Sequence, residues 1–294
     1  MIINYLILVH KNFSQLDRMI KALDGNGVFF YVHVDRDFSR SIEKCDFLTA
    51  ENVKIISKSF SVNWGGFSMV KATIELINES VKSKNKGYHV LISGQDFPIM
   101  SKEIIFNKLS ANYGLEYIEY WPLPYKKWAY GGRNRIEQYW FIDKIGLNES
   151  TIIANLQKIN GFVRNGLFDF PIFGGSQWWC LTYECICYVL KFIKKNRVII
   201  NYFELTLIPD ELFFQTILLN SLYRDRIVND NLRYIDFEKG SSHPKTLKKS
   251  CLKSLQSSGK LWARKFDNQQ DSEILDLIEF SIKQKNDGNN LIVY

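Results

Sequence analysis

Residues 88–99 decide the fold, because the sequence YHVLISGQDFPI joins a buried strand to a polar turn. The run from Tyr88 to Ser93 is largely apolar and lies between two glycines, which predicts a strand covered on both faces. Such strands belong to parallel sheets, whose ligands bind beyond the carboxyl ends of the strands. The residues that follow the strand, Gly94-Gln95-Asp96, are therefore candidates for a binding site.

The segments around this strand alternate between short apolar runs and amphipathic runs. Strands are predicted over residues 2–9, 28–34, 53–57 and 88–93, and helices over residues 13–23, 67–82 and 101–110. This alternation predicts an α/β protein with a mostly parallel sheet and helices on both faces. His10, Asp35 and Asp96 each follow a strand, so they are expected at one edge of the sheet.

The later part of the chain has a less regular pattern. Residues 117–173 are rich in aromatic side chains and are predicted to form long loops with short elements. From residue 177 onward helices are expected to dominate, over residues 182–195, 209–223 and 271–284, and the basic residues 245–260 are a candidate mobile loop. Because no repeat or linker divides the chain, a single domain over residues 1–294 is expected.

The composition excludes several classes of protein. A chain of 294 residues that is 46% apolar can bury a large core, and its net charge of +7 suits an anionic ligand or membrane surface. It has no arginine-rich run, so nucleic-acid binding is not expected. The five cysteines lack metal-site spacing and suit reduced thiols. No segment has membrane-spanning length, which favours a cytoplasmic protein with at most peripheral membrane association.

Three short motifs carry both a functional and a structural interpretation. Asp35-Arg36-Asp37 after the second predicted strand suits a divalent ion, a hydrogen bond to a ribose or base, or a surface turn. Trp64-Gly65-Gly66 precedes a helix and suits either a phosphate cradle with a stacking tryptophan or plain packing. Arg264-Lys265 beside aromatic residues suits either a diphosphate partner or a solvated pair.

The stretch IPDELFFQTIL, residues 208–218, also has two interpretations. Pro209 and the acidic residues Asp210 and Glu211 suit the first turn of a helix, where negative charge opposes the helix dipole. Alternatively, one of the two carboxylates is a catalytic base that a rigid turn holds in place.

Seven motifs in this order resemble a known family, the Core-2/I-branching β-1,6-N-acetylglucosaminyltransferases and peptide O-xylosyltransferases, which form glycosyltransferase family 14. They are HVD (33–35), VNWGGFSMV (62–70), ISGQDFPI (92–99), GGSQWWCLT (174–182), IPDELFFQTIL (208–218), NLRYI (231–235) and LWARKFD (261–267). The resemblance extends over residues 3–285 and is somewhat closer to the xylosyltransferase branch.

The resemblance implies a GT-A fold, with a nucleotide-binding half over residues 1–115 and an acceptor-binding and catalytic-base half over residues 116–294. It implies an inverting, metal-independent transfer from a UDP-sugar, favouring UDP-N-acetylglucosamine or UDP-xylose, to a glycan or glycolipid hydroxyl without a cofactor. The animal enzymes carry a membrane anchor, a stem and disulfides. Their absence here implies a compact bacterial relative in surface-polysaccharide synthesis; a catalytically inactive UDP-sugar- or glycan-binding protein is the alternative.

The resemblance also assigns roles to residues of this sequence. Glu211 would be the general base. The donor-binding residues would be His10, Asp35 and Trp64 near the uridine, Asp96 at the donor sugar, and Arg264 and Lys265 at the diphosphate. The acceptor-binding residues would be Glu119, Gln177, Trp178 and Tyr234. Gln177 stands where xylosyltransferases carry an aspartate, which leaves the choice of acceptor open.

Overall fold

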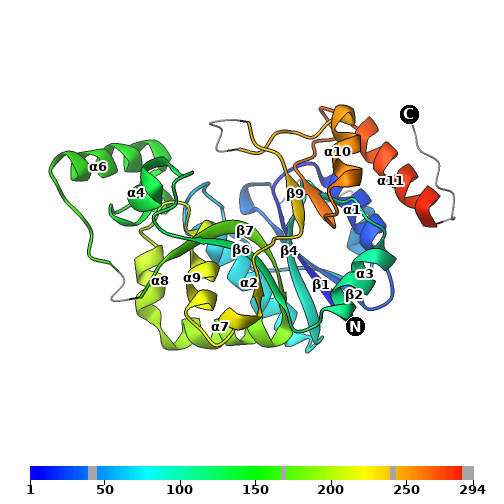
Figure 1. Cartoon of the computed structure of the whole chain (residues 1–294), viewed down its shortest axis with the longest axis horizontal. Coiled ribbons are helices and arrows are strands. Elements are labelled where there is room, and N and C mark those ends of the chain that lie inside the picture. The colour runs from blue at the N-terminus through cyan, green and yellow to red at the C-terminus, as the bar shows by residue number, and fades with distance from the viewer. Residues whose placement is uncertain (39–44, 167–169, 239–242, 287–294) are drawn as a thin grey trace.

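The computed structural model describes residues 1–38, 45–166, 170–238 and 243–286 (Figure 1). Its centre is a seven-stranded sheet with the strand order β3-β2-β1-β4-β7-β6-β8. These strands are β1 (Ile2–Val9), β2 (Val28–Val34), β3 (Val53–Ile55), β4 (Gly87–Ser93), β6 (Glu116–Pro122), β7 (Phe173–Thr182) and β8 (Ile227–Val228). A smaller sheet has the order β5-β10-β9, with β5 (Asp96–Pro98), β10 (Trp262–Arg264) and β9 (Arg233–Ile235).

The large sheet is mostly parallel, as the alternation of strands and helices predicts. β1 pairs in parallel with β2 and β4, and β3 extends this order beside β2. β7 is antiparallel to both of its neighbours, β4 and β6. β7 therefore joins the strands of residues 1–115 to β6 and β8 in one continuous sheet. The division of the chain into two functional halves stays a prediction.

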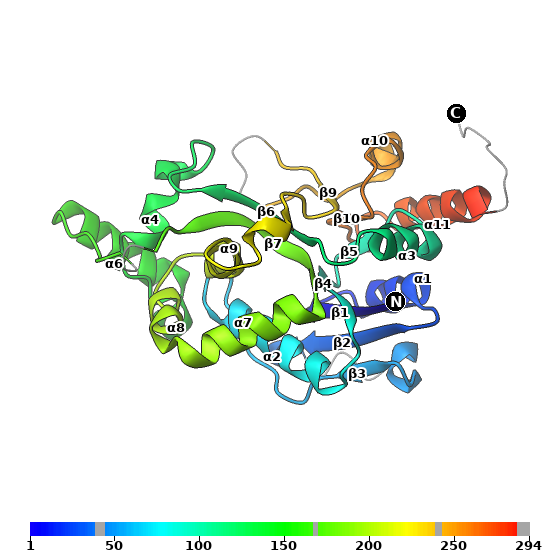
Figure 2. The ribbon, with the colours of Figure 1, turned by 60° about the horizontal axis from the view of Figure 1, so that its bottom comes forward.

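Helices cover both faces of this sheet (Figures 1 and 2). Side chains of β1 alternate between the two faces, so that Ile3, Tyr5 and Ile7 join one core and Leu6 and Leu8 the other. The first core includes residues of α1 (Phe13–Leu23), α3 (Lys102–Ala111), α10 (Leu252–Ser257) and α11 (Glu273–Asn286). The second includes residues of α2 (Ser68–Lys82), α7 (Tyr183–Lys195), α8 (Arg197–Phe203) and α9 (Phe213–Leu219).

Most predicted elements of the first hundred residues are confirmed within one or two residues. The bounds of β1, α1 and β2 agree with the sequence-based ranges. Ser101 caps α3, since its hydroxyl accepts a hydrogen bond from the Ile104 N–H at 3.3 Å. Thr182 caps α7 in the same way through the Cys185 N–H at 3.3 Å.

Three expectations for the later part are wrong, whereas the helices predicted over residues 182–195 and 271–284 are confirmed as α7 and α11 within two residues. Residues 117–173 contain most of β6 and the thirteen-residue helix α6 (Leu147–Ile159), as well as the short α4 (Arg133–Ile136) and α5 (Ile142–Ile145). Residues 177–182 form the end of β7, which pairs with β4 and β6, and α7 begins directly after them. The helix expected over residues 209–223 divides into a 3-10 turn, Pro209–Glu211, and α9, since Leu212 has an extended φ of −132°. The candidate loop 245–260 contains α10, held by the buried Leu255.

None of the helices in the described residues is both long and apolar enough to cross a membrane.

Candidate active site

Asp35 ties the end of β2 to the segment that leads to Trp64. One carboxylate oxygen accepts a hydrogen bond from the Asp37 N–H and the other from the Val62 N–H, each at 3.0 Å. The Asp35 side chain is nearly buried, and Asp37 accepts a hydrogen bond from Ser61. Of the three interpretations of this motif, the turn is therefore observed, and a contact between Asp35 and a nucleotide stays a prediction.

The glycine pair after Trp64 does not form an open phosphate cradle. The carboxylate of Asp143 accepts hydrogen bonds from the Ser68 N–H at 2.8 Å and the Ser68 hydroxyl at 2.7 Å. It lies so close that a Cβ added to Gly66 would be 2.3 Å from its Oδ1 atom. The start of α2 is thus already occupied by a negative charge, which corrects the phosphate interpretation.

Trp64 lies on a chain of contacts that links distant motifs. Its side chain is 44% exposed, and its ring centroid is 5.3 Å from that of His243. Close to His243 along the chain, the Leu247 N–H donates to the Lys265 carbonyl at 2.8 Å. On its other side, the Gly65 carbonyl accepts from the Ile208 N–H at 2.9 Å. The Trp64 segment therefore connects the Arg264-Lys265 motif to the turn that carries Glu211.

The carboxylate of Asp96 pairs with Arg264 and holds it in position. The Asp96 carboxylate is fully buried, and its oxygens lie 3.5 Å from Nε of Arg264 and 3.8 Å from Nε of Arg233. Burial raises the pKa of Asp96 and lowers the pKa of Arg233 to about 10, so Arg233 keeps its charge at neutral pH. Because Asp96 has no exposed surface, its visible role is to position Arg264, and its contact with a donor sugar stays a prediction.

The guanidinium of Arg264 also lies over Trp178, with its Cζ atom 4.0 Å from the ring centroid. Its Nε and Nη1 atoms are buried without hydrogen-bond partners among the described residues. Burial lowers the pKa of the neighbouring Lys265, and the charges of Arg264 and Lys11 act in the same direction. Burial likewise lowers the pKa of His10, as do Lys11, Arg264 and Lys265. The ends of β1 and β10 thus form one cationic cluster with unused hydrogen-bond donors.

Glu211 also contacts an arginine, at a more exposed position than Asp96 does. Nη1 of Arg135 lies 2.7 Å from Oε2 of Glu211, and 33% of the Glu211 side chain is exposed. The guanidinium of Arg135 is stacked 3.5 Å over the ring of Trp128. Asp210 is buried behind Glu211, and burial together with the charge of Glu211 raises the pKa of Asp210 to about 7. Only one of the two neighbouring carboxylates is therefore accessible.

The predicted acceptor residues differ in their surroundings. Glu119 accepts a hydrogen bond from the Asn231 amide at 3.1 Å; burial raises its pKa, and the charges of Asp230 and Glu211 act in the same direction. Gln177 has a buried amide nitrogen without a partner among the described residues. The third, Tyr234, is half-buried against the core that contains α1. Trp178 contacts Arg264, so it belongs with the cationic cluster.

Sequence reasoning missed the roles of Arg135, Arg233 and Asp143. Arg233 lies within the NLRYI motif, which is a usable signal. Arg135 and Asp143 have no local signal, because their contacts with Glu211 and Ser68 connect residues 76 and 75 positions apart.

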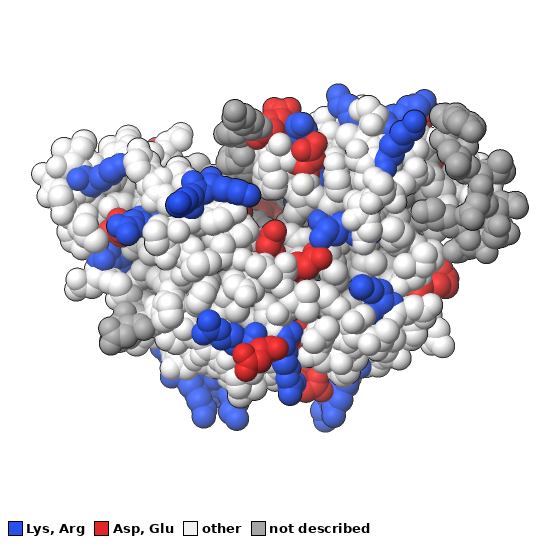
Figure 3. All heavy atoms as spheres, in the orientation of Figure 1, with Lys and Arg blue, Asp and Glu red and all other residues white. Residues whose placement is uncertain are grey.

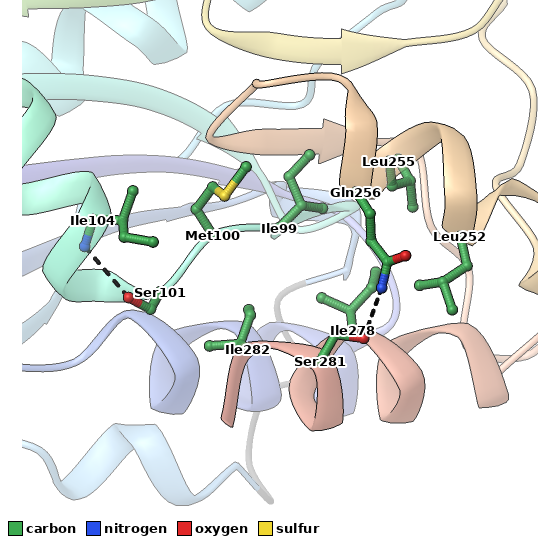
Figure 4. A pocket seen from close by; sticks show the side chains of 10 residues that line it. All are labelled: Ile99, Met100, Ser101, Ile104, Leu252, Leu255, Gln256, Ile278, Ser281 and Ile282. Carbon is green, nitrogen blue, oxygen red and sulfur yellow. Dashed lines mark hydrogen bonds between the residues drawn. The ribbon is translucent and has the colours of Figure 1, made fainter. Parts of the chain in front are cut away.

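The surface is hollowed between the lobe that carries α4 and α6 and the part that carries β9 (Figure 3). Acidic atoms lie in this hollow, and basic atoms lie on its rim on the side of the lobe. A separate pocket lies between α3, α10 and α11 and is lined by Ile99, Met100, Ser101, Ile104, Leu252, Leu255, Gln256, Ile278, Ser281 and Ile282 (Figure 4). None of these side chains titrates, so this pocket offers no acid or base.

A family model covers most of the chain. The model of the family described as "Core-2/I-Branching enzyme" matches residues 3–258. The chain therefore belongs to the Core-2/I-branching enzyme family, which is a family of glycosyltransferases.

Several xylosyltransferases are similar to this chain. Xylosyltransferase oxt of Drosophila pseudoobscura pseudoobscura is 27% identical over 76% of this chain and 25% of its own length. Human Xylosyltransferase 2 is 25% identical over 95% of the chain and 33% of its own length. Xylosyltransferase sqv-6 of Caenorhabditis elegans is 26% identical over 92% of the chain and 35% of its own length. The chain thus spans about a quarter to a third of these relatives.

Proposed function

We propose that the chain transfers a sugar from a UDP-sugar to a hydroxyl group of a glycan or glycolipid, with inversion and formation of a β-linkage. UDP-N-acetylglucosamine and UDP-xylose are the favoured donors. The observation that supports this most is the position of Glu211, a half-exposed carboxylate connected through the Trp64 segment to the Arg264-Lys265 motif. A base and a cationic cluster are the two groups that such a transfer needs.

In the proposed reaction the acceptor oxygen attacks the anomeric carbon as the bond from that carbon to the diphosphate oxygen breaks. UDP leaves with the electron pair of that bond, and Glu211 takes the proton of the acceptor hydroxyl. Arg264 and Lys265 stabilise the charge that develops on the diphosphate. The Nη1 atom of Arg264 has no hydrogen-bond partner among the described residues, which supports this role, since a bound anion would supply the missing acceptor.

Metal independence is part of the proposal. Among the described residues, no three His, Cys, Asp or Glu side chains gather into a group that could hold a metal ion. The Asp35 and Asp37 carboxylates are engaged in turn hydrogen bonds. The proposal rests on the cations at the ends of β1 and β10, which can neutralise a diphosphate directly. Activity that depends strictly on Mn²⁺ or Mg²⁺ would instead assign the Asp35-Asp37 pair to a metal.

Two measurements test the proposed function. A thermal-shift screen with UDP-sugars should show stabilisation by the true donor, because a ligand that binds only the folded state raises the unfolding temperature. Release of UDP in the presence of a glycan acceptor and EDTA should then show turnover. Stabilisation without any turnover would support the alternative, a UDP-sugar-binding protein without catalysis; no stabilisation by any nucleotide sugar would contradict both.

We propose synthesis of a surface polysaccharide by a cytoplasmic enzyme that contacts the membrane surface at most peripherally. The net charge of +7 supports contact with an anionic surface.

A further inference from the structure

An aromatic cluster lies at the end of β6, in a part of the chain without an assigned role. The rings of Trp121 and Tyr125 are stacked with their centroids 4.4 Å apart and their planes at 19°. Trp128 meets Trp121 edge-on at 5.3 Å. Tyr125 and Trp128 are also linked by the backbone, since the Trp128 N–H donates to the Tyr125 carbonyl at 3.0 Å. These contacts fix the three half-buried rings relative to one another.

The cluster is pressed against β7 at Gly174. A Cβ atom added to Gly174 would lie 2.7 Å from Trp128 and 2.8 Å from the indole nitrogen of Trp121. Only a glycine allows this close approach of the aromatic rings to the strand. The motif that contains Gln177 and Trp178 begins at this glycine, so the cluster is fixed beside the predicted acceptor residues.

The cluster also adjoins the proposed base. Trp128 stacks on Arg135 at 3.5 Å, and Arg135 contacts Glu211 at 2.7 Å. Lys126 and Lys127 directly precede Trp128 along the chain. Both lysines therefore lie within two residues of the ring that stacks on the partner of Glu211.

The charged residues near the proposed base and the aromatic cluster fall into two groups. Glu119, Asp230 and Glu211 interact electrostatically, and Asp230 and Glu211 pair with Lys260 and Arg135. Lys126 and Lys127 are exposed, and neither forms an ion pair with any other described residue. The lobe side is basic in the space-filling view (Figure 3). A ligand that fits these charges has a neutral end near the three carboxylates and a negative group near Lys126 and Lys127.

We propose that the loop of residues 121–128 binds an acidic glycan as the acceptor. The nonpolar faces of the sugar rings would pack on the aromatic cluster, and a carboxylate or phosphate on an inner sugar would contact Lys126 and Lys127. The neutral terminal sugar would then present its hydroxyl to Glu211. This inference rests on the proposed transferase function and narrows its acceptor to one class.

The experiment compares matched acceptors. A tetrasaccharide of alternating N-acetylglucosamine and glucuronate, with N-acetylglucosamine at its non-reducing end, is tested against its carboxyl-reduced form by calorimetry and by UDP release. A phosphate-bearing mannose oligosaccharide and its dephosphorylated form make the second pair. The wild type should bind at least one acidic member about 2- to 30-fold more tightly, as expected for two exposed charge contacts.

The double variant Lys126→Ala/Lys127→Ala should lose this preference. The matched control Lys194→Ala/Lys195→Ala removes an adjacent exposed pair at the end of α7 and should keep it. Preference for the glucuronate or the phosphate member identifies the anion. Equal binding of the acidic and neutral forms, or a preference that survives in the loop variant, overturns the proposal. Failure of the transferase function is detected separately, by the absence of stabilisation with every UDP-sugar.

Discussion

Two carboxylates of the proposed site, Asp96 and Glu211, contact arginines at different depths. Asp96 has no exposed surface and lies between Arg233 and Arg264. The contact between Glu211 and Arg135 reaches the surface, with 33% and 13% of the side chains exposed. The deep contact can only fix geometry, whereas the shallow contact can exchange its partner for a substrate group. The same type of contact therefore fixes the arginine side chains around Asp96 and leaves the Glu211 carboxylate accessible to a substrate.

The two regions differ in their access to water. Water screens the shallow pair, so its contribution to stability is small and its carboxylate can be released at low cost. Removing one member of the deep cluster leaves the remaining charges buried without a counter-charge, which is costly. Substitutions in the two regions should therefore separate effects on catalysis from effects on stability.

The largest effect is expected from Glu211→Gln. The amide keeps the shape of the side chain but cannot take a proton, so turnover should fall by about 100- to 10,000-fold. UDP-sugar binding should remain, because Arg264 and Lys265 are unchanged. UDP release and thermal shift measure the two properties.

The control for this variant is Glu204→Gln. Glu204 is similarly half-exposed and pairs with Lys71 at 3.0 Å, but it lies outside the proposed site. Its turnover should stay near that of the wild type. Turnover of Glu211→Gln within a few-fold of the wild type would remove Glu211 from the role of base.

The second effect is a loss of stability in Asp96→Ala. Arg233 and Arg264 would keep buried charges without their shared counter-ion, so the free energy of unfolding should fall by about 3 to 5 kcal/mol. Asp276→Ala breaks an exposed pair with Arg18, at 2.6 Å, and should cost less than about 1 kcal/mol. Denaturant titration of both variants tests the contrast; equal losses would show that burial does not distinguish the two contacts.

The two regions also differ in how far the sequence predicts them. The ends of β1, β2 and β4 could be located because short apolar runs alternate with helical patterns, and the α/β class follows from that alternation. The region around β7 could not, since its ten residues are held as a strand by pairing with β4 and β6. Long-range pairing leaves no period in the local sequence.

The same distinction applies to the candidate residues. The sequence predicts that His10, Asp35 and Asp96 each follow a strand, and the structure confirms this. Their surroundings were not predictable: the sequence does not reveal that Asp96 lies between two arginines, or that Asp143 fills the glycine turn before α2. Roles that depend on a partner many residues away need the three-dimensional arrangement.

The third effect concerns Asp210, which is buried like Asp96 but forms no ion pair with the described residues. Burial raises its folded-state pKa from 3.8 to about 7. The folded state then binds the proton more tightly than the unfolded state, so this contribution to stability is complete below pH 4 and is lost as the pH rises toward 7. Asp210→Asn stays neutral and should gain stability relative to the wild type over this interval, on the order of 1 to 3 kcal/mol.

Denaturant titrations at pH 4.5 and pH 8 measure this gain. The difference in free energy of unfolding between Asp210→Asn and the wild type should be larger at pH 8. A difference that is the same at both pH values would show that Asp210 does not change its protonation on folding in this range.

The smallest effect is the coupling between Arg135 and Glu211, measured by a double-mutant cycle. Arg135→Ala and Glu211→Gln each remove the ion pair, so their combined effect on the free energy of unfolding should be less than the sum by about 0.5 to 1 kcal/mol. Arg133→Ala is the matched control, because Arg133 lies on the same helix and pairs instead with Glu137 at 4.0 Å. Its effect should add to that of Glu211→Gln without coupling.

This cycle tests whether the shallow contact is as weak as its exposure implies. Coupling of several kcal/mol would place it with the Asp96 cluster, and Arg135 would then hold Glu211 too firmly for the carboxylate to leave it when an acceptor binds. A small coupling leaves the carboxylate free to turn toward an acceptor hydroxyl while Arg135 stays stacked on Trp128. In that case the difference in depth between the two contacts is what allows one site to hold its cation rigidly and its base loosely.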